Sequence, residues 1–201
     1  MSLCVSQDIE SMSRNGLARV LRLNKTGMPT AWLSREAAAT VYAKGMVVWT
    51  LGDTPIVMRG GINRLGERSR LEMAPIIACD GDIHDSGFEP GLENRLLFRR
   101  DQHICMYCGD EFPEELLSRD HIVPVSRGGK NRWANVVTAC KRCNHHKGNR
   151  TPEEAGMELM AVPFRPNLFE FMYLANRCIL GDQMEYLKAR FSGRRQWDLA
   201  A

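Results

Sequence analysis

Four of the seven cysteines in this 201-residue chain form two C-x-x-C pairs, Cys105 with Cys108 and Cys140 with Cys143. Two thiolates three positions apart on a tight turn can occupy two corners of a tetrahedron, so two such pairs can complete a four-coordinate zinc site. A site made of four cysteines leaves no open position for a substrate. We therefore expect a structural Zn²⁺ that helps this segment to fold, with a redox or disulfide role as the alternative.

Residues 109–139 separate the two pairs, a longer insertion than the commonest zinc ribbons contain. The insertion carries the adjacent pair Asp120 and His121, and Asn144 directly follows the last cysteine. Phosphodiester cleavage needs an attacking hydroxide and stabilisation of charge on the phosphorane and the leaving oxygen, which polar side chains and one hard cation can supply. Adjacent residues of a strand face opposite ways unless the strand ends there, so the sequence alone leaves the individual roles open.

In chain order the segment reads C-x-x-C-G, D-H-I-x-P-x-S-x-G-G, N-V-V and C-x-x-C-N-x-x-K-G. This set resembles the zinc-ribbon form of the HNH endonucleases, a branch of the ββα-metal nucleases, over residues 99–150. The resemblance implies that His121 is the general base and that Asn135 braces the loop carrying it. It also implies that Asp120 and Asn144 bind a catalytic metal, for which their hard oxygen donors favour Mg²⁺ or Mn²⁺.

The last position of the pattern is often His in this family, whereas here it is Asn144. Either His145 or His146 could serve as the ligand instead if the closing helix starts one residue later. This alternative stays open.

Basic residues concentrate in the same segment. The formal net charge is only +3, yet residues 127–150 contain seven basic side chains and no acidic one, which is typical of a polyanion-binding surface. The resemblance implies phosphate contacts for Lys147 and Arg150, and ordinary helix-surface charge is the alternative. Arg127 and Lys130 flank two glycines that let the backbone approach a phosphate closely, so we expect this loop to grip DNA.

Composition sets the broad class. A chain with 44% hydrophobic and 25% charged residues is neither disordered nor fibrous. No apolar run approaches 18 residues, and residues 1–10 lack the pattern of a secretory signal. We therefore expect a cytoplasmic protein that makes no contact with a membrane.

These residues must be positioned by an α+β fold in three parts. We expect a small α+β region at residues 1–90, a ββα-metal nuclease core with zinc knuckles at 94–155, and a C-terminal helical extension at 156–201. Hydrophobic patterning and turn residues predict the strands and helices of these parts. The predicted strands lie in 17–23, 46–51, 55–58 and 119–125, and the predicted helices lie at about 34–44 and begin at 94, 144 and 151. A loose linker from about 60 contains one extended piece around 76–78, and apolar helical stripes run over 168–191.

The sequence therefore predicts a metal-dependent endonuclease that cuts DNA to 5′-phosphate and 3′-hydroxyl ends, by nicking or by double-strand cleavage. A homodimer would be the simplest way to cut both strands with one site per chain. Three alternatives remain open: a non-catalytic zinc-ribbon protein that binds nucleic acid, an interaction protein that assembles through its C-terminal helices, and a nuclease that acts on RNA.

Overall fold

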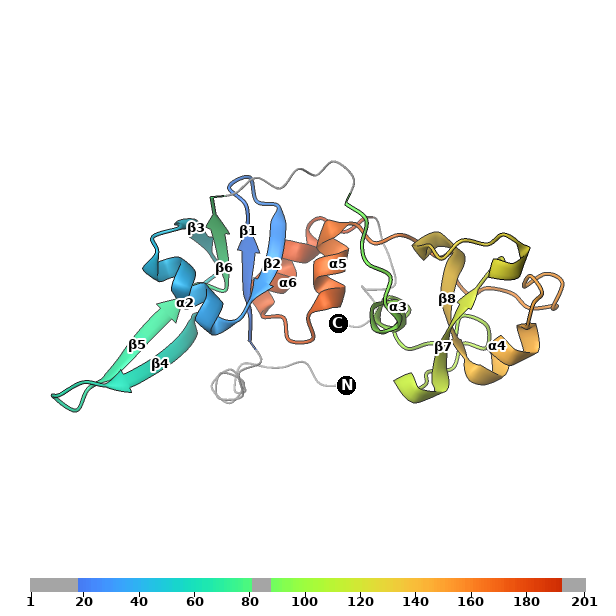
Figure 1. Ribbon diagram of the computed structural model, residues 1–201, viewed down its shortest axis with the longest axis horizontal. Helices are drawn as coiled ribbons and strands as arrows, with labels where there is room; N and C mark the ends of the chain where they lie inside the picture. Colours follow the sequence, from blue (N-terminus) through green and yellow to red (C-terminus); the bar gives the residue numbers. More distant parts are fainter. Residues whose placement is uncertain (1–17, 81–87, 193–201) are drawn as a thin grey trace. The chain divides into compact units, whose positions relative to one another are not determined.

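The computed structural model describes residues 18–80 and 88–192, which form two compact units (Figure 1). Unit 1 is drawn from residues 1–88 and 168–201, and unit 2 is Glu89–Asn167. The predicted mixed α+β architecture is confirmed. Within these residues, no helix combines the length and the apolar character that crossing a lipid bilayer requires.

Unit 1 is built on a four-stranded sheet with the order β2, β1, β6, β3. β1 (Val20–Leu23) pairs antiparallel with β2 (Pro29–Leu33) and parallel with β6 (Ile76–Cys79), and β6 pairs antiparallel with β3 (Val47–Leu51). The central strands are apolar on both faces because both faces are covered. Val20 and Ile77 belong to the core on one face, and alternate residues such as Leu21 belong to the core on the other.

Helices cover the two faces of this sheet. α2 (Arg35–Ala43) starts at the predicted cap, where the Ser34 hydroxyl accepts a hydrogen bond from the Ala37 N–H at 3.2 Å. α5 (Leu168–Ala175) and α6 (Gly181–Lys188) supply buried side chains to the opposite core. These helices, which we expected within a separate C-terminal extension, therefore belong to the same unit as the N-terminal sheet. The three domain boundaries themselves stay predictions.

A two-stranded antiparallel ribbon follows β3. β4 (Ile56–Ile62) pairs with β5 (Arg68–Met73), where we expected a loose linker. Gly60 and Gly61 interrupt the register of this ribbon and do not lie in a loop, which explains why glycine content was misleading here.

Unit 2 carries the predicted ββα arrangement. α3 (Asn94–Arg100) precedes the first cysteine pair, and β7 (Leu117–His121) pairs antiparallel with β8 (Val136–Cys140), which leads into α4 (Lys141–Lys147). Short 3-10 helices occupy Glu114–Leu116, Val125–Arg127 and Trp133–Asn135. β7 ends at His121, earlier than predicted, and α4 begins before Cys143, earlier than predicted.

A buried ion pair joins the parts of unit 2. Arg100, 4% exposed, donates to both carboxylate oxygens of Asp101, at 2.7 and 3.0 Å. Its guanidinium also donates to the carbonyl oxygens of Trp133, Val136 and Phe164. Asp101 in turn accepts from the Thr138 N–H of β8 at 2.7 Å. These contacts fix α3 against the strand that leads to the second cysteine pair.

We predict that Arg100→Met strongly destabilises unit 2, because Asp101 and three backbone carbonyls would lose their buried donor. The expected loss in free energy of unfolding is about 3 to 5 kcal/mol. Hydrogen exchange of the β8 amides measures this within unit 2. Arg95→Met, at an exposed position of the same helix, is the control, and equal exchange in both variants would contradict the role of Arg100.

Candidate functional site

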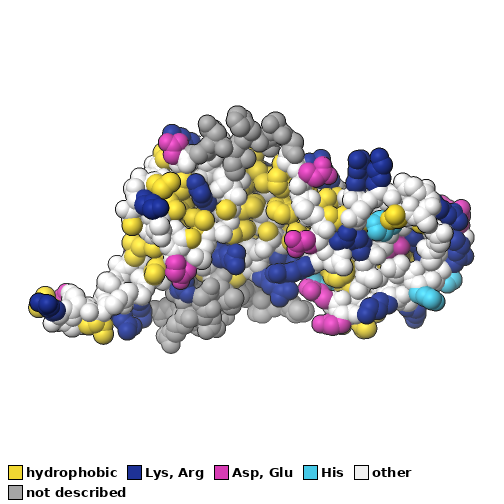
Figure 2. Space-filling view, in the orientation of Figure 1, with side chains coloured by type: hydrophobic (Ala, Val, Ile, Leu, Met, Phe, Trp, Pro, Cys, Tyr) yellow, Lys and Arg dark blue, Asp and Glu magenta, His cyan; other side chains and the backbone are white. Residues whose placement is uncertain are grey.

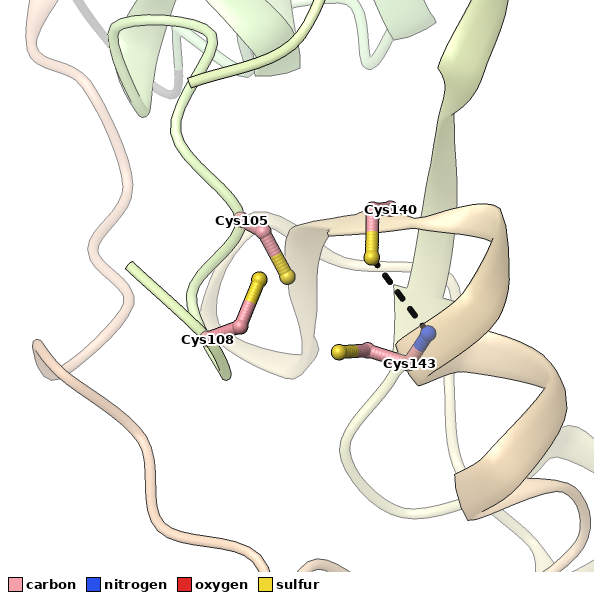
Figure 3. A group of neighbouring side chains, drawn as sticks. All are labelled: Cys105, Cys108, Cys140 and Cys143. Atoms are coloured by element: carbon pink, nitrogen blue, oxygen red, sulfur yellow. Dashed lines mark hydrogen bonds between the residues drawn. The ribbon is translucent and has the colours of Figure 1, made fainter. Parts of the chain in front are cut away.

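The four paired cysteines converge on one point (Figure 3). Their Sγ atoms all lie within 4.8 Å of one another. Cys105 and Cys108 come from the turn after α3, Cys140 ends β8, and Cys143 lies in the first turn of α4. The Cys140 sulfur also caps α4 by accepting from the Cys143 N–H at 3.4 Å. Four sulfur donors in one group fit a tetrahedral ion such as zinc.

The environment of the thiols is uneven. Burial raises the pKa of Cys108 to about 11 and also raises the pKa of Cys143. Burial pushes the pKa of Cys105 upward too, but hydrogen bonds from the backbone of its neighbours outweigh this effect and leave that pKa lowered. Since a metal binds thiolates, uptake of an ion at neutral pH must release protons from Cys108 and Cys143.

Asp120 lies beside this cluster and is held from two sides. The carboxyl group is 5% exposed. The Tyr107 hydroxyl donates to its Oδ2 at 2.5 Å, and the Lys147 ammonium donates to its Oδ1 at 3.0 Å. Burial, together with the bond to Asp120, raises the pKa of Tyr107, so its hydroxyl remains a donor. Because Tyr107 lies inside the first C-x-x-C pair, the turn that carries this pair directly positions Asp120.

Lys147 is placed differently from the expected phosphate contact. Its side chain is 1% exposed, and besides Asp120 its ammonium donates to the His121 carbonyl oxygen at 2.7 Å. Helical spacing could have predicted this burial. Lys147 lies four residues after Cys143, so both side chains lie on the face of α4 that packs against the hairpin. A buried charge survives there because Asp120 compensates it.

His121 lies half-buried at the end of β7. Its Nε2 is 3.2 Å from the Asn131 Oδ1 atom, which also accepts from the Arg119 guanidinium at 2.9 Å. Sequence reasoning missed Asn131. Since an amide oxygen only accepts, Nε2 carries the proton and Nδ1 is left as the acceptor on the imidazole.

Asn135 closes the loop that follows His121. Its Oδ1 accepts from the Val123 N–H at 3.0 Å, and its Nδ2 donates to the carbonyl oxygens of Val123 and Lys130. Gly129 completes the closure, because a Cβ at that position would lie 1.7 Å from the Val123 oxygen. This geometry supports the predicted bracing role of Asn135.

Asn144 faces the hairpin from α4. Its Nδ2 donates to the Ser118 hydroxyl at 2.8 Å and to the Arg119 carbonyl oxygen at 3.3 Å. Asp120, His121 and Asn144 line one open pocket of about 310 Å³, to which His145 and His146 do not contribute. The structure therefore brings the three predicted residues together.

The pocket fits a hard divalent cation by its donor set. An amide oxygen and a carboxylate are the ligands that Mg²⁺ and Mn²⁺ prefer. An ionised carboxylate offers about four lone-pair sites, so the two hydrogen bonds to Asp120 leave sites for a metal. Asp120 and Asn144 are the residues that would hold it.

Three other residues were expected to contact DNA. The Arg127 guanidinium donates to both carboxylate oxygens of Glu154, and Arg150 donates to backbone carbonyls at the end of α4. Lys130 is exposed, and its ammonium has no partner within residues 18–80 and 88–192. Exposed ion pairs such as Arg127 with Glu154 are weak, so a phosphate can replace the carboxylate.

The helix predicted from Thr151 does not form. Thr151 and Glu154 make the reciprocal bonds of a capping box, at 3.4 and 3.0 Å. The chain then completes only a turn, because Gly156 takes a left-handed conformation with φ of 66°.

We predict that Cys143→Ser abolishes high-affinity zinc binding and unfolds unit 2, since the binding free energy of a structural zinc is also folding free energy. Metal analysis of the purified chain and thermal unfolding measure both effects. Cys178→Ser, which removes a thiol outside the cluster, should bind zinc like the unchanged chain. A folded Cys143→Ser protein with full zinc content would refute the site.

We predict that Lys147→Met destabilises unit 2 by about 3 to 5 kcal/mol, because it leaves the Asp120 carboxylate buried without a counter-charge. Lys141→Met, at an exposed position of the same helix, should change stability by less than about 0.5 kcal/mol. Chemical denaturation followed by hydrogen exchange of β7 compares the two. If both variants behave alike, Lys147 does not compensate Asp120.

Comparisons with known proteins agree with this geometry. Residues 105–160 match a family model described as HNH endonuclease. The chain is 38% identical over 60 residues to a CRISPR-associated endonuclease Cas9 of Actinomyces naeslundii, which covers 29% of this chain and 5% of that protein. It is 44% identical over 46 residues to a CRISPR-associated endonuclease Cas9 of Corynebacterium diphtheriae, which covers 22% of this chain and 4% of that protein.

The matches are thus confined to one small part of much longer relatives. The segment that matches the family model, residues 105–160, contains both cysteine pairs, the β7–β8 hairpin and α4. Sequence match and ββα arrangement together identify residues 105–160 as a domain of the HNH endonuclease family.

Proposed function

We propose that this chain is a metal-dependent endonuclease that hydrolyses DNA phosphodiester bonds to leave 5′-phosphate and 3′-hydroxyl ends. The observation that carries the proposal is the pocket shared by Asp120, His121 and Asn144. These residues come from the end of one strand and from the helix that follows its partner strand, and the hairpin and zinc cluster hold both elements together.

His121 is the proposed general base. With Nε2–H directed at Asn131, its Nδ1 is the atom that takes a proton from the attacking water. The bonds of Asn135 to Val123 and of Lys147 to the His121 carbonyl fix the backbone at and just after His121. An imidazole held in this way needs little reorientation when the substrate binds.

Asp120 and Asn144 are the proposed ligands of Mg²⁺ or Mn²⁺. When bound, such a cation supplies stabilisation of the charge on the phosphorane and on the leaving 3′ oxygen. Tyr107 and Lys147 prevent the Asp120 carboxylate from rotating, and the Asn144 amide is fixed by Ser118. The site grips the backbone of the substrate and reads no base, so sequence preference must come from elsewhere in the chain or from a partner.

We predict that His121→Ala lowers the rate of plasmid cleavage by about 10² to 10⁴, the usual contribution of a positioned base. Supercoiled plasmid is incubated with Mg²⁺ or Mn²⁺ and scored for nicked and linear product. His146→Ala is the matched control, because that imidazole is exposed and lies outside the pocket.

Each result has a clear reading. Omission of added Mg²⁺ and Mn²⁺ is preferable to a chelator as the metal-free control, since a chelator also strips zinc. Full activity in a clean His121→Ala preparation, with intact fold and zinc content, would falsify the assignment of the base. Binding without cleavage by the unchanged chain would instead support the non-catalytic alternative.

A further inference from the structure

The β4–β5 ribbon reaches beyond the packed part of unit 1 (Figure 1). Ile56 and Met73, at its base, are buried in the core. Every residue from Arg59 to Glu72 is exposed on both faces of the ribbon. Within the described parts of the chain, this segment therefore has no core of its own that would explain its length.

The end of the ribbon is nevertheless well ordered by its own hydrogen bonds. The Asn63 side chain accepts from the N–H groups of Leu65 and Glu67, at 2.9 and 3.0 Å, and donates to the Glu67 carboxylate at 3.1 Å. The Asn63 N–H donates to the Glu67 carbonyl oxygen at 2.8 Å. This turn presents Arg64 and Leu65 outward in a fixed conformation.

The charge of the ribbon is unbalanced. Residues 59–72 carry four arginines and two glutamates. Arg70 pairs with Glu72, and Asn63 holds Glu67. No carboxylate among the described residues pairs with the remaining three arginines, which are Arg59, Arg64 and Arg68.

The register adds to this imbalance. Arg59 lies directly opposite Arg70, an arrangement of like charges that destabilises an antiparallel pair. Because Arg70 is paired with Glu72, the guanidinium that is left without a carboxylate at this position is that of Arg59. The two glutamates of the ribbon are engaged by Arg70 and Asn63, so Arg59, Arg64 and Arg68 are free to pair with an anionic partner.

Apolar side chains at the end of the ribbon narrow the class of partner. Leu65 is 83% exposed and Ile62 is 63% exposed, next to the unpaired arginines. Figure 2 shows Lys and Arg side chains together with hydrophobic ones at the end of this ribbon. The major groove of duplex DNA admits a two-stranded β-ribbon, and apolar side chains can contact the methyl group of thymine there.

We propose that the β4–β5 ribbon is a DNA-binding arm that lies in a groove of duplex DNA. Its arginines neutralise backbone phosphates, and Leu65 contacts the bases. The choice of DNA rests on the proposed function of the HNH domain. This arm is a part of the chain outside the HNH domain that can add affinity and sequence preference to a site that reads only the backbone.

Binding by the full chain tests the arm separately from cleavage. The affinity for a fluorescent 30-base-pair DNA duplex is measured by anisotropy at several salt concentrations, with no added Mg²⁺ or Mn²⁺. The arm variant is Arg64→Gln with Arg68→Gln. The matched control is Arg19→Gln with Lys44→Gln, which removes two exposed charges elsewhere in unit 1.

We expect the arm variant to bind about 10- to 100-fold more weakly near 0.1 M salt. The slope of log affinity against log salt should decrease by about two, one for each lost phosphate contact. Leu65→Ser should weaken binding with no change in slope, because it removes no charge. The control pair should change the slope by less than half as much as the arm variant.

Equal effects of the arm and control variants would overturn the proposal. Failure of the unchanged chain to bind duplex DNA would also overturn it. So would an arm variant that loses affinity only for an RNA duplex measured in the same way. Plasmid cleavage distinguishes this outcome from failure of the nuclease proposal. If the chain binds DNA through the arm but does not cleave plasmid, the arm proposal holds and the nuclease proposal is wrong. If the chain cleaves plasmid and the arm variant binds DNA as well as the unchanged chain, the nuclease proposal holds and the arm proposal is wrong.

Discussion

The contact that the rest of unit 2 depends on is the buried carboxylate of Asp120 between Tyr107 and Lys147. Tyr107 belongs to the turn of the first cysteine pair, and Lys147 belongs to the helix that starts at the second. The distance between the two donors is therefore set by the cysteine cluster. Displacement of either cysteine pair would move one donor and leave a buried charge without its partner. The fold of the cluster and the geometry of the pocket therefore depend on each other.

The apolar cluster around the cysteines, next to this contact, is small. The core cluster around the cysteines contains Cys105, Ala139 and Cys140 as its buried members, with aromatic side chains such as Phe112 packed against it. Buried polar contacts also hold the elements of unit 2 together, and the pair formed by Arg100 and Asp101 is one of them. Such contacts are directional, and each group that loses its partner is costly, which favours one arrangement over near alternatives.

The sequence predicts this unit better than it predicts unit 1. The cysteine pairs and the motifs between them are short and follow one another in the chain, so the sequence indicates them directly. In the structure the four cysteines lie together, and Asp120, His121 and Asn144 line one pocket. The burial of Lys147 escapes prediction because charge suggests exposure, and only the opposing carboxylate reverses that preference. The ribbon after β3 escapes because glycines usually mark loops, and the turn at Thr151 fails to extend because one glycine ends it.

The path of the chain through unit 1 has a consequence for biosynthesis. The strands of its sheet precede unit 2 in the chain. One face of the sheet is covered by α5 and α6, which follow unit 2. All residues of unit 2 have left the ribosome once residue 167 has emerged. One hydrophobic face of the sheet in unit 1 stays uncovered until residues 168–188 have also been made. The cysteine cluster can thus form first, and the strands of the sheet acquire this layer only after residues 168–188 have been made.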